Sequence, residues 1–91
     1  GFSFSMSPNP ASQQVELALE DASEGVQSRE SKELLETYEI EMSDMNGLVL
    51  YAKKSKSKKL KIDVSTMKKG LYNVKVIYKG EIKSSKFLIS R

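Results

Sequence analysis

The side chains that could perform chemistry in this sequence are carboxylates, serines and lysines. The chain contains neither histidine nor cysteine, so the commonest general base, the commonest metal ligand and the thiolate nucleophile are all missing. Glu39 and Glu41 stand two residues apart, and two carboxylates at a fixed separation are the pair that hydrolyses glycosidic bonds. Both fall on the polar side of an alternating segment. We therefore interpret them as a solvated face that pairs with lysines.

Other catalytic and metal chemistry finds little support in the residue pattern. A serine activated by a lysine is a known nucleophile, but no local motif singles out one pair among the many serines and lysines. The acidic residues are scattered and form no calcium-loop pattern. We expect no catalytic residue, no cofactor, no metal and a protein that is not an enzyme.

The nine residues from Lys53 to Lys61, KKSKSKKLK, include six lysines. Lys53, Lys54, Lys56 and Lys58 are candidates for binding a polyanion. The run lacks aromatic residues for base stacking and arginine for bidentate phosphate contacts, so nucleic acid is not an expected partner. The interpretation we favour is a soluble hairpin loop and a charged strand edge that discourages aggregation.

Charge is distributed unevenly along the chain. Residues 1–50 contain ten acidic residues against two basic ones, and residues 51–91 contain thirteen basic residues against two acidic ones. The two halves therefore carry formal charges of −8 and +11, and the whole chain carries +3. Attraction between the halves of one sheet structure is the interpretation we favour, with a basic binding face as the alternative.

These side chains must be positioned by extended segments, because apolar residues recur with period two. The alternation places one apolar face on each segment, and the expected core residues are Phe2, Phe4, Met6, Val15, Leu17, Leu19, Tyr38, Ile40, Met42, Leu60, Ile62, Val64, Tyr72, Val74, Val76, Tyr78, Phe87 and Ile89. Counting the segment 48–53, the chain has seven such segments. Carbohydrate binding would need a row of exposed aromatic residues, and only Tyr51 has an ambiguous side.

Turn residues fall between these segments. Asn46-Gly47 predicts a two-residue type I′ hairpin turn, which needs positive φ at both residues. Lys79-Gly80 predicts a second tight turn, and Gly70 a backbone bend without a β-carbon. Tyr72 is a candidate for a tyrosine corner, with its hydroxyl bonded to backbone near Met67. The alternative is a core tyrosine whose hydroxyl lies in water.

The pattern predicts one all-β domain over residues 1–91, a seven-stranded immunoglobulin-like antiparallel β-sandwich with Greek-key connections. A long polar crossover is expected around residues 20–37. Its stretch SRESKELLE has helix-forming composition, so we expect it to be part helical or mobile, with Leu34 and Leu35 against the rim. Pro8 and Pro10 fix φ and donate no hydrogen bond, so SPNPAS reads as a rigid lead-in to the strand at Val15.

Four stretches of the chain together carry a family resemblance. They are Pro8, Asn9, Pro10 and Ala11; Asp44, Asn46, Gly47, Val49 and Leu50; Val64, Met67, Gly70, Leu71 and Tyr72 followed by Val74 and Val76; and Lys86, Phe87 and Ile89. In this order and spacing, the chain from Pro8 to its end resembles the C-terminal type A sorting domain of the type IX secretion system of Bacteroidota. The crossover is longer and more charged than the corresponding loop of that family.

The resemblance implies a non-enzymatic module that directs export of a cargo protein to the outer-membrane surface, where a peptidase cuts upstream of it. It implies secretion machinery as partner and a location that is secreted, periplasmic in transit or at the outer-membrane surface. The recognition candidates that it implies are Lys86, Phe87 and Ile89 of the last strand, with Pro8, Asn9 and Pro10 orienting the domain.

The alternative is a stand-alone secreted or periplasmic immunoglobulin-like protein that binds a protein or a polyanion. Because the chain begins with Gly1 rather than Met, we expect an upstream part to be missing from it. The apolar runs are too short for a transmembrane segment.

Overall fold

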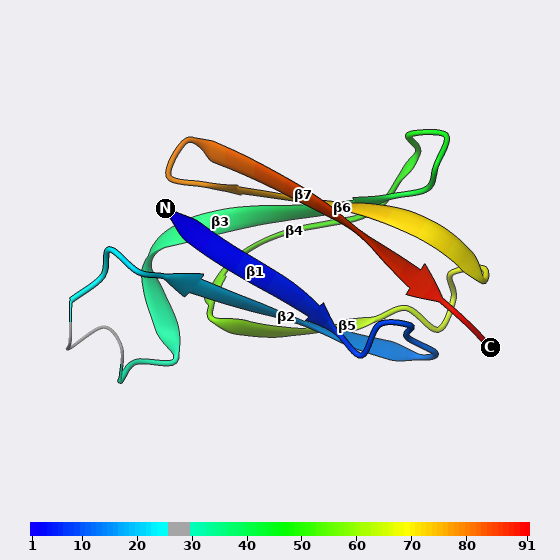
Figure 1. The fold of residues 1–91 in the computed structure, drawn as a ribbon, viewed down its shortest axis with the longest axis horizontal. Coiled ribbons are helices and arrows are strands. Elements are labelled where there is room, and N and C mark those ends of the chain that lie inside the picture. The colour runs from blue at the N-terminus through cyan, green and yellow to red at the C-terminus, as the bar shows by residue number, and fades with distance from the viewer. Residues whose placement is uncertain (26–29) are drawn as a thin grey trace.

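The computed structural model describes residues 1–25 and 30–91, and these residues form seven β-strands and no helix (Figure 1). The strands are β1 (Phe2–Ser7), β2 (Gln14–Asp21), β3 (Glu33–Ser43), β4 (Val49–Ser57), β5 (Lys59–Asp63), β6 (Gly70–Tyr78) and β7 (Glu81–Ile89). Each follows one of the alternating segments. The prediction of an all-β fold with seven strands is confirmed.

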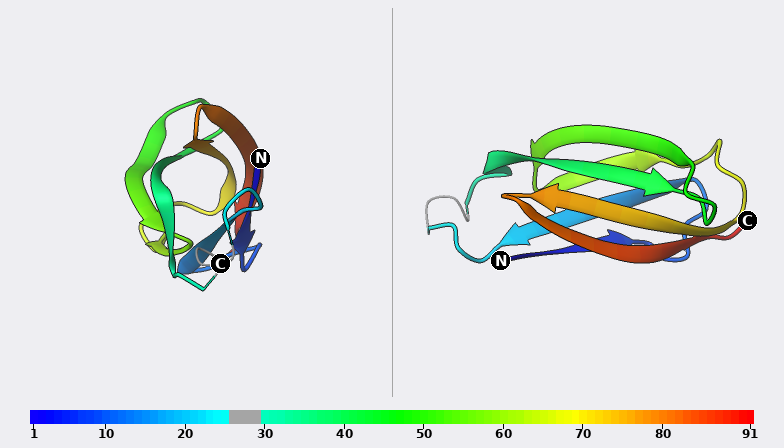
Figure 2. Two further views of the ribbon diagram at one scale, coloured as in Figure 1. Left: turned by 90° about the vertical axis from the view of Figure 1, so that its left-hand side faces the viewer. Right: turned by 90° about the horizontal axis from the view of Figure 1, so that it is seen from above.

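The strands form two antiparallel sheets. One sheet has the order β1-β2-β5 and the other has the order β4-β3-β6-β7. Seen along the strands, the two sheets curve around a shared interior (Figure 2). The chain passes from the larger to the smaller sheet between β4 and β5, so the lysine run continues from one sheet into the other.

The interior is filled by the residues that the period-two pattern places inward. Val15, Ile40, Ile62, Val74 and Ile89 are each at most 1% exposed, although they come from five different strands. Burying apolar surface is the main favourable contribution to folding at this chain length. Of the expected core residues only Phe4 is half-buried, and the core also takes in residues outside the alternating pattern, namely Ala11, Leu34 and Met67.

The two hairpin turns differ in geometry, and only the second has the backbone angles of a type I′ turn. The prediction of a type I′ turn at Asn46-Gly47 is wrong, because only Gly47 has positive φ there. The Asp44 carboxylate accepts hydrogen bonds from the backbone N–H groups of Asn46 and Leu48 (2.9 and 3.0 Å), which stabilises a longer loop. The hairpin itself is confirmed. At Lys79-Gly80 both residues have positive φ (51° and 77°), as a type I′ turn requires.

The polar crossover is shorter than predicted. Strand β2 extends to Asp21 and β3 begins at Glu33, so Leu34 and Leu35 belong to a strand rather than to a helix. The alternation of β3 buries Leu34 and exposes Leu35. The buried Glu24 carboxylate accepts a hydrogen bond from the Leu35 N–H (3.0 Å), which holds this strand end in place. The first two residues of the stretch predicted to be helical, 28–29, lie outside the described residues.

Two further predictions concern Gly70 and Tyr72. Gly70 has a φ of 144° at the first position of β6, where a β-carbon would be strained. The Tyr72 hydroxyl donates to the backbone carbonyl of Lys68, four residues upstream. The acceptor lies next to Met67, as a tyrosine corner at Tyr72 requires.

Attraction between the acidic and basic halves of the chain is visible in the ion pairs. Lys75 lies 3.6 Å from the Glu41 carboxylate across the β3–β6 pair, and Lys79 lies 2.8 Å from Asp21. Glu41 thus pairs with a lysine on the outer face of the sheet, as expected for a solvated face.

Candidate functional site

The proline-containing lead-in and the last strand are joined by backbone hydrogen bonds. The Ala11 N–H donates to the Leu88 carbonyl and the Ser90 N–H donates to the Ala11 carbonyl, both at 2.8 Å. The Asn9 side-chain oxygen accepts from the Leu88 N–H at 2.9 Å. Ala11 and Ile89 form a parallel bridge. We call this contact the terminal bridge, and it joins segments almost eighty positions apart.

Proline at both positions suits this geometry. Pro8 and Pro10, each preceded by a cis peptide bond, lack a backbone N–H and cannot extend the ladder beyond the terminal bridge. Between them, Asn9 supplies a side-chain acceptor where a strand would supply a carbonyl. The lead-in therefore leaves β1, which lies in the three-stranded sheet, and contacts β7 of the other sheet for only a few residues.

The sequence-derived recognition candidates of β7 face in two directions. Phe87 and Ile89 are buried in the core, and the Phe87 ring stacks on Tyr72 with centroids 5.6 Å apart. Lys86 and Leu88 are exposed on the outer face of the sheet. Only the outer face of β7 is accessible to a partner, so Phe87 and Ile89 can act on recognition only by holding the strand in place.

Ahead of the terminal bridge, the edge of β7 pairs with no other described strand, and the Lys83 ammonium reaches across to the Phe2 carbonyl of β1. Alternate residues of an edge strand direct their N–H and C=O groups away from the sheet. The N–H and C=O groups of Leu88 point away from β6 and bond to Asn9 and Ala11. The backbone groups of Ile82, Ser84 and Lys86, at alternate positions of the same strand, therefore also point away from β6. Strand β7 is the last in its sheet. These three residues therefore present backbone groups to which an extended segment could pair.

The opposite edge of the same sheet is chemically different. Strand β4 exposes Lys53, Lys54 and Lys56, and none of the three forms an ion pair with another described residue. Apart from Lys58, which lies between β4 and β5, the lysine run lies in strands and not in a hairpin loop, so that part of our interpretation is wrong. Lysines along an edge strand discourage pairing with other chains. Strand β7 has two lysines, Lys83 and Lys86, against three exposed lysines on β4.

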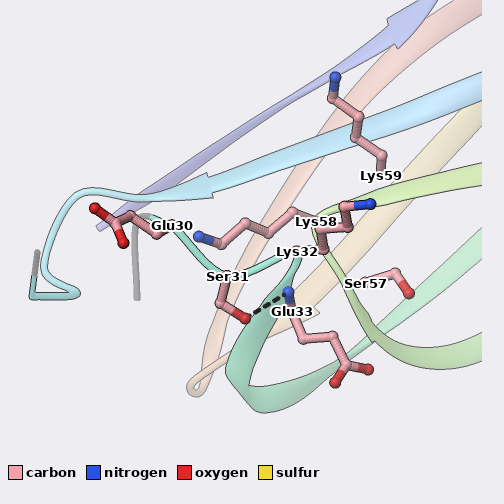
Figure 3. A pocket seen from close by; sticks show the side chains of 7 residues that line it. All are labelled: Glu30, Ser31, Lys32, Glu33, Ser57, Lys58 and Lys59. Atoms are coloured by element: carbon pink, nitrogen blue, oxygen red, sulfur yellow. Dashed lines mark hydrogen bonds between the residues drawn. The ribbon is translucent and has the colours of Figure 1, made fainter. Parts of the chain in front are cut away.

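A cleft of about 650 Å³ lies where β4 passes into β5 (Figure 3). It is lined by both charge types: Lys32, Lys58 and Lys59 are accompanied by Glu30 and Glu33. The Lys58 backbone is engaged on both sides, donating to the Lys32 carbonyl and accepting from the Leu19 N–H. The two carboxylates offset most of the charge of the three lysines, so this cleft attracts a phosphate less than a purely basic surface would.

Tyr51, the residue considered for carbohydrate binding, packs half-buried against the core. It therefore does not present a flat aromatic face to solvent. In the part of the chain that the structure describes, no three acidic residues lie close enough together to hold a metal ion. Nor do these residues form a helix of the length and hydrophobicity that crossing a bilayer would need.

A charged cluster of Asp21, Tyr78 and Lys79 lies at the end of the fold opposite the terminal bridge. The sequence pattern does not predict it. The Asp21 carboxylate, only 2% exposed, accepts from the Tyr78 hydroxyl (2.7 Å) and pairs with Lys79. The Lys79 ammonium, followed by the Ser23 hydroxyl, holds the pKa of Asp21 well below its usual range. Burial and then the Asp21 carboxylate raise the pKa of Tyr78 to about 12. Tyr78 ends β6 and Lys79 is the first residue of the turn, while Asp21 ends β2, 57 residues before Tyr78.

Comparison with protein-family models identifies a match that covers almost the whole chain. Residues 5–90 match the family model described as the secretion system C-terminal sorting domain. The search of curated proteins finds no match. The matched region begins just before the lead-in and ends just after β7, so it contains the whole terminal bridge.

Proposed function

The chain belongs to the secretion system C-terminal sorting domain family, and we propose that it directs a cargo protein through type IX secretion to the outer-membrane surface. The family match over residues 5–90 is the observation that carries this proposal. The members of this family are non-catalytic modules, and we extend that description to this chain. The domain would act as one module of a larger secreted protein.

We further propose that the strands are connected as an immunoglobulin-like Greek key. The strand orders β1-β2-β5 and β4-β3-β6-β7 support this topology, and so does the tyrosine corner at Tyr72. The parallel bridge between Ala11 of the lead-in and Ile89 of β7 adds a contact between the two sheets.

Recognition by the secretion machinery would use the open edge and outer face of β7. Ile82, Ser84 and Lys86 supply backbone groups for pairing with an extended segment, while the side chain of Lys86 is exposed beside Leu88. Pro8, Asn9 and Pro10 would keep this strand in position through the terminal bridge. Strand addition gives affinity through main-chain hydrogen bonds and specificity through alternate side chains.

A secretion assay tests the proposal. Residues 1–91 are fused behind a reporter carrying a periplasmic export signal, in a host that has type IX machinery. The expected result is reporter at the cell surface or in the medium, and reporter that stays in the periplasm contradicts the sorting function.

Matched variants then test the recognition surface. Ser84→Pro removes the outward N–H of the β7 edge and should strongly reduce export, whereas Ser84→Ala keeps it and should export normally. Lys86→Glu should reduce export more than Lys54→Glu, an exposed lysine on the other edge of the same sheet. Circular dichroism of the purified variants checks that each is folded. Equal export by both members of each pair would contradict recognition through β7.

A further inference from the structure

The β3–β4 hairpin exposes an unusual concentration of apolar side chains. Met45, Leu48, Val49 and Leu50 are between 44% and 61% exposed, and we refer to these four residues as the apolar hairpin. Figure 1 shows that its loop rises away from the smaller sheet, near the end where β6 begins and β7 finishes. Scattered exposed apolar residues are ordinary, whereas a contiguous group on a projecting loop indicates a contact surface.

The hairpin is held in a defined conformation. Its backbone is fixed by the Asp44 carboxylate and by the hydrogen bond from the Gly47 N–H to the Asp44 carbonyl (3.1 Å). Met45 lies over the outer face of the sheet, where the Asn73 amide contacts its sulfur at 3.7 Å. The exposed side chains are therefore presented in a fixed arrangement, which lowers the entropy that binding would cost.

The apolar surface extends from the hairpin in two directions. Leu71 and Leu88 lie opposite each other on β6 and β7 and are both exposed on the outer face of the sheet. They are two residues along their strands from the facing pair Asn73 and Lys86. On the other side, Leu48 and Leu50 line a groove of about 430 Å³ together with Met67 and Lys68.

Positive charge surrounds this apolar surface. Lys68 and Lys69 are exposed in the β5–β6 connection beside the groove, and Lys86 lies directly opposite Asn73. None of these lysines forms an ion pair with another described residue. The nearby acidic residue is Asp44, whose carboxylate is used by the backbone of the hairpin.

From this combination we propose that the apolar hairpin inserts into the interfacial region of an anionic lipid bilayer. The projecting side chains would enter the boundary between headgroups and acyl chains, while Lys68 and Lys69 contact lipid phosphates. Apolar insertion and electrostatic attraction to anionic lipid together give stable peripheral binding. Exposed apolar side chains beside lysines without an ion-pair partner among the described residues are the combination that an anionic lipid surface can satisfy.

Vesicle binding by the isolated chain tests this proposal without any secretion machinery, so its outcome is independent of the sorting function. The chain contains no tryptophan, so Leu48→Trp introduces a single fluorescent reporter at the tip. Ile82→Trp is the matched control, because Ile82 is 60% exposed and Leu48 is 61% exposed. With vesicles of phosphatidylcholine and phosphatidylglycerol in equal parts, only the tryptophan at position 48 should shift to shorter wavelength and be quenched by brominated acyl chains.

Cosedimentation with the same vesicles separates the two contributions. Met45→Gln/Leu48→Gln should lower the partition coefficient at least about tenfold, while Leu35→Gln/Ile82→Gln, at equally exposed positions, should leave it unchanged. Lys68→Gln/Lys69→Gln should lower it by about fivefold per lysine, and Lys53→Gln/Lys54→Gln by much less. Raising the salt concentration should weaken binding of the unmodified chain.

Four outcomes would overturn the proposal. They are absence of binding to the anionic vesicles, equal fluorescence shifts at positions 48 and 82, equal losses in the hairpin and control variants, and binding to pure phosphatidylcholine that matches binding to the anionic mixture. Sedimentation without vesicles provides a fifth. If the unmodified chain self-associates and Met45→Gln/Leu48→Gln abolishes the association, the hairpin is instead an interface between copies of this chain.

Discussion

The two ends of the fold hold their strands together by different chemistry. At one end Asp21 is enclosed between the Tyr78 hydroxyl and the Lys79 ammonium. At the other end the apolar hairpin is open to solvent, and the nearby strand ends are fixed by hydrogen bonds to backbone carbonyls. The charged end encloses the side chains of its cluster in internal contacts, whereas the hairpin end leaves its four apolar side chains exposed to solvent. Substitutions at the first end should therefore change stability, and those at the second should change binding.

The largest effect is expected from Asp21→Ala. The substitution leaves the enclosed Tyr78 hydroxyl without its acceptor and should lower the free energy of unfolding by about 2 kcal/mol, measured by urea denaturation. Asp44→Ala, which removes the aspartate of the hairpin end, should cost about 1 kcal/mol, because its backbone donors are exposed and can bond to water. A larger loss for Asp44→Ala would reverse the proposed contrast between the two ends.

Acid should weaken the charged end selectively. The pKa of Asp21 is lower in the folded than in the unfolded state, so its contribution to stability is full above the unfolded value of about 4 and is lost as pH falls below it. The urea midpoint of the unmodified chain should therefore fall more steeply below about pH 4 than that of Asp21→Asn. Parallel curves for the two proteins would contradict the linkage.

Alkaline pH should weaken the same cluster by ionising the Tyr78 hydroxyl. The folded state raises the pKa of Tyr78 to about 12, so its contribution is full below the unfolded value of about 10 and is lost as pH rises from there. Tyr78→Phe should show a flatter profile of unfolding free energy against pH above about pH 10 than the unmodified chain, as measured by urea denaturation.

Tyr72→Phe removes the hydroxyl that bonds to the Lys68 carbonyl. It should lower the free energy of unfolding by about 1 kcal/mol at neutral pH, measured by urea denaturation.

The terminal bridge should respond locally and by less. Asn9→Ala removes the acceptor of the Leu88 N–H and should cost below about 1 kcal/mol. Hydrogen exchange at the Leu88 amide should become faster, while Asn9→Asp, which keeps an oxygen acceptor, should retain its protection. Exchange that is unchanged in Asn9→Ala would show that the side chain does not hold the last strand.

The smallest change in stability is expected at the apolar hairpin. Met45→Gln/Leu48→Gln replaces exposed side chains without disturbing the core, so the free energy of unfolding should stay within about 0.5 kcal/mol of the unmodified value. Thermal or urea denaturation checks this expectation. A substantial loss would mean that the hairpin stabilises the fold and is not reserved for a partner.

The strands and the core followed from the sequence because burial imposes a strict period of two. The alternation in TYEIEMS and LYNVKVIY assigns inward and outward residues before any partner strand is known. The sequence prediction is wrong where the crossover meets β3, because SKELLE has helix-forming composition. In the structure, Glu33 pairs with β4 and Leu34 is buried, and these contacts stabilise a strand. Local propensity is a weak guide when tertiary contacts oppose it.

The turn at Asn46-Gly47 illustrates a second limit. Its sequence is typical of type I′, but the Asp44 side chain offers hydrogen bonds that stabilise a longer loop. The Asp21 cluster and the exposure of the apolar hairpin depend on contacts between distant segments, which no periodicity reveals. Pro8 and Pro10 predict a rigid lead-in to β2. They do not predict that this lead-in pairs with β7, a contact that only the structure shows.

The chain termini lie at opposite ends of the longest axis, with Gly1 at the charged end and Arg91 beyond β7 (Figure 1). The principal extent of the molecule in that direction is 40 Å. A folded protein attached ahead of Gly1 would begin beside Glu81, at the start of β7, and away from the apolar hairpin at the opposite end of the long axis. Under the proposals made above, the hairpin and the last residues of β7 would therefore remain accessible whatever the size of that protein.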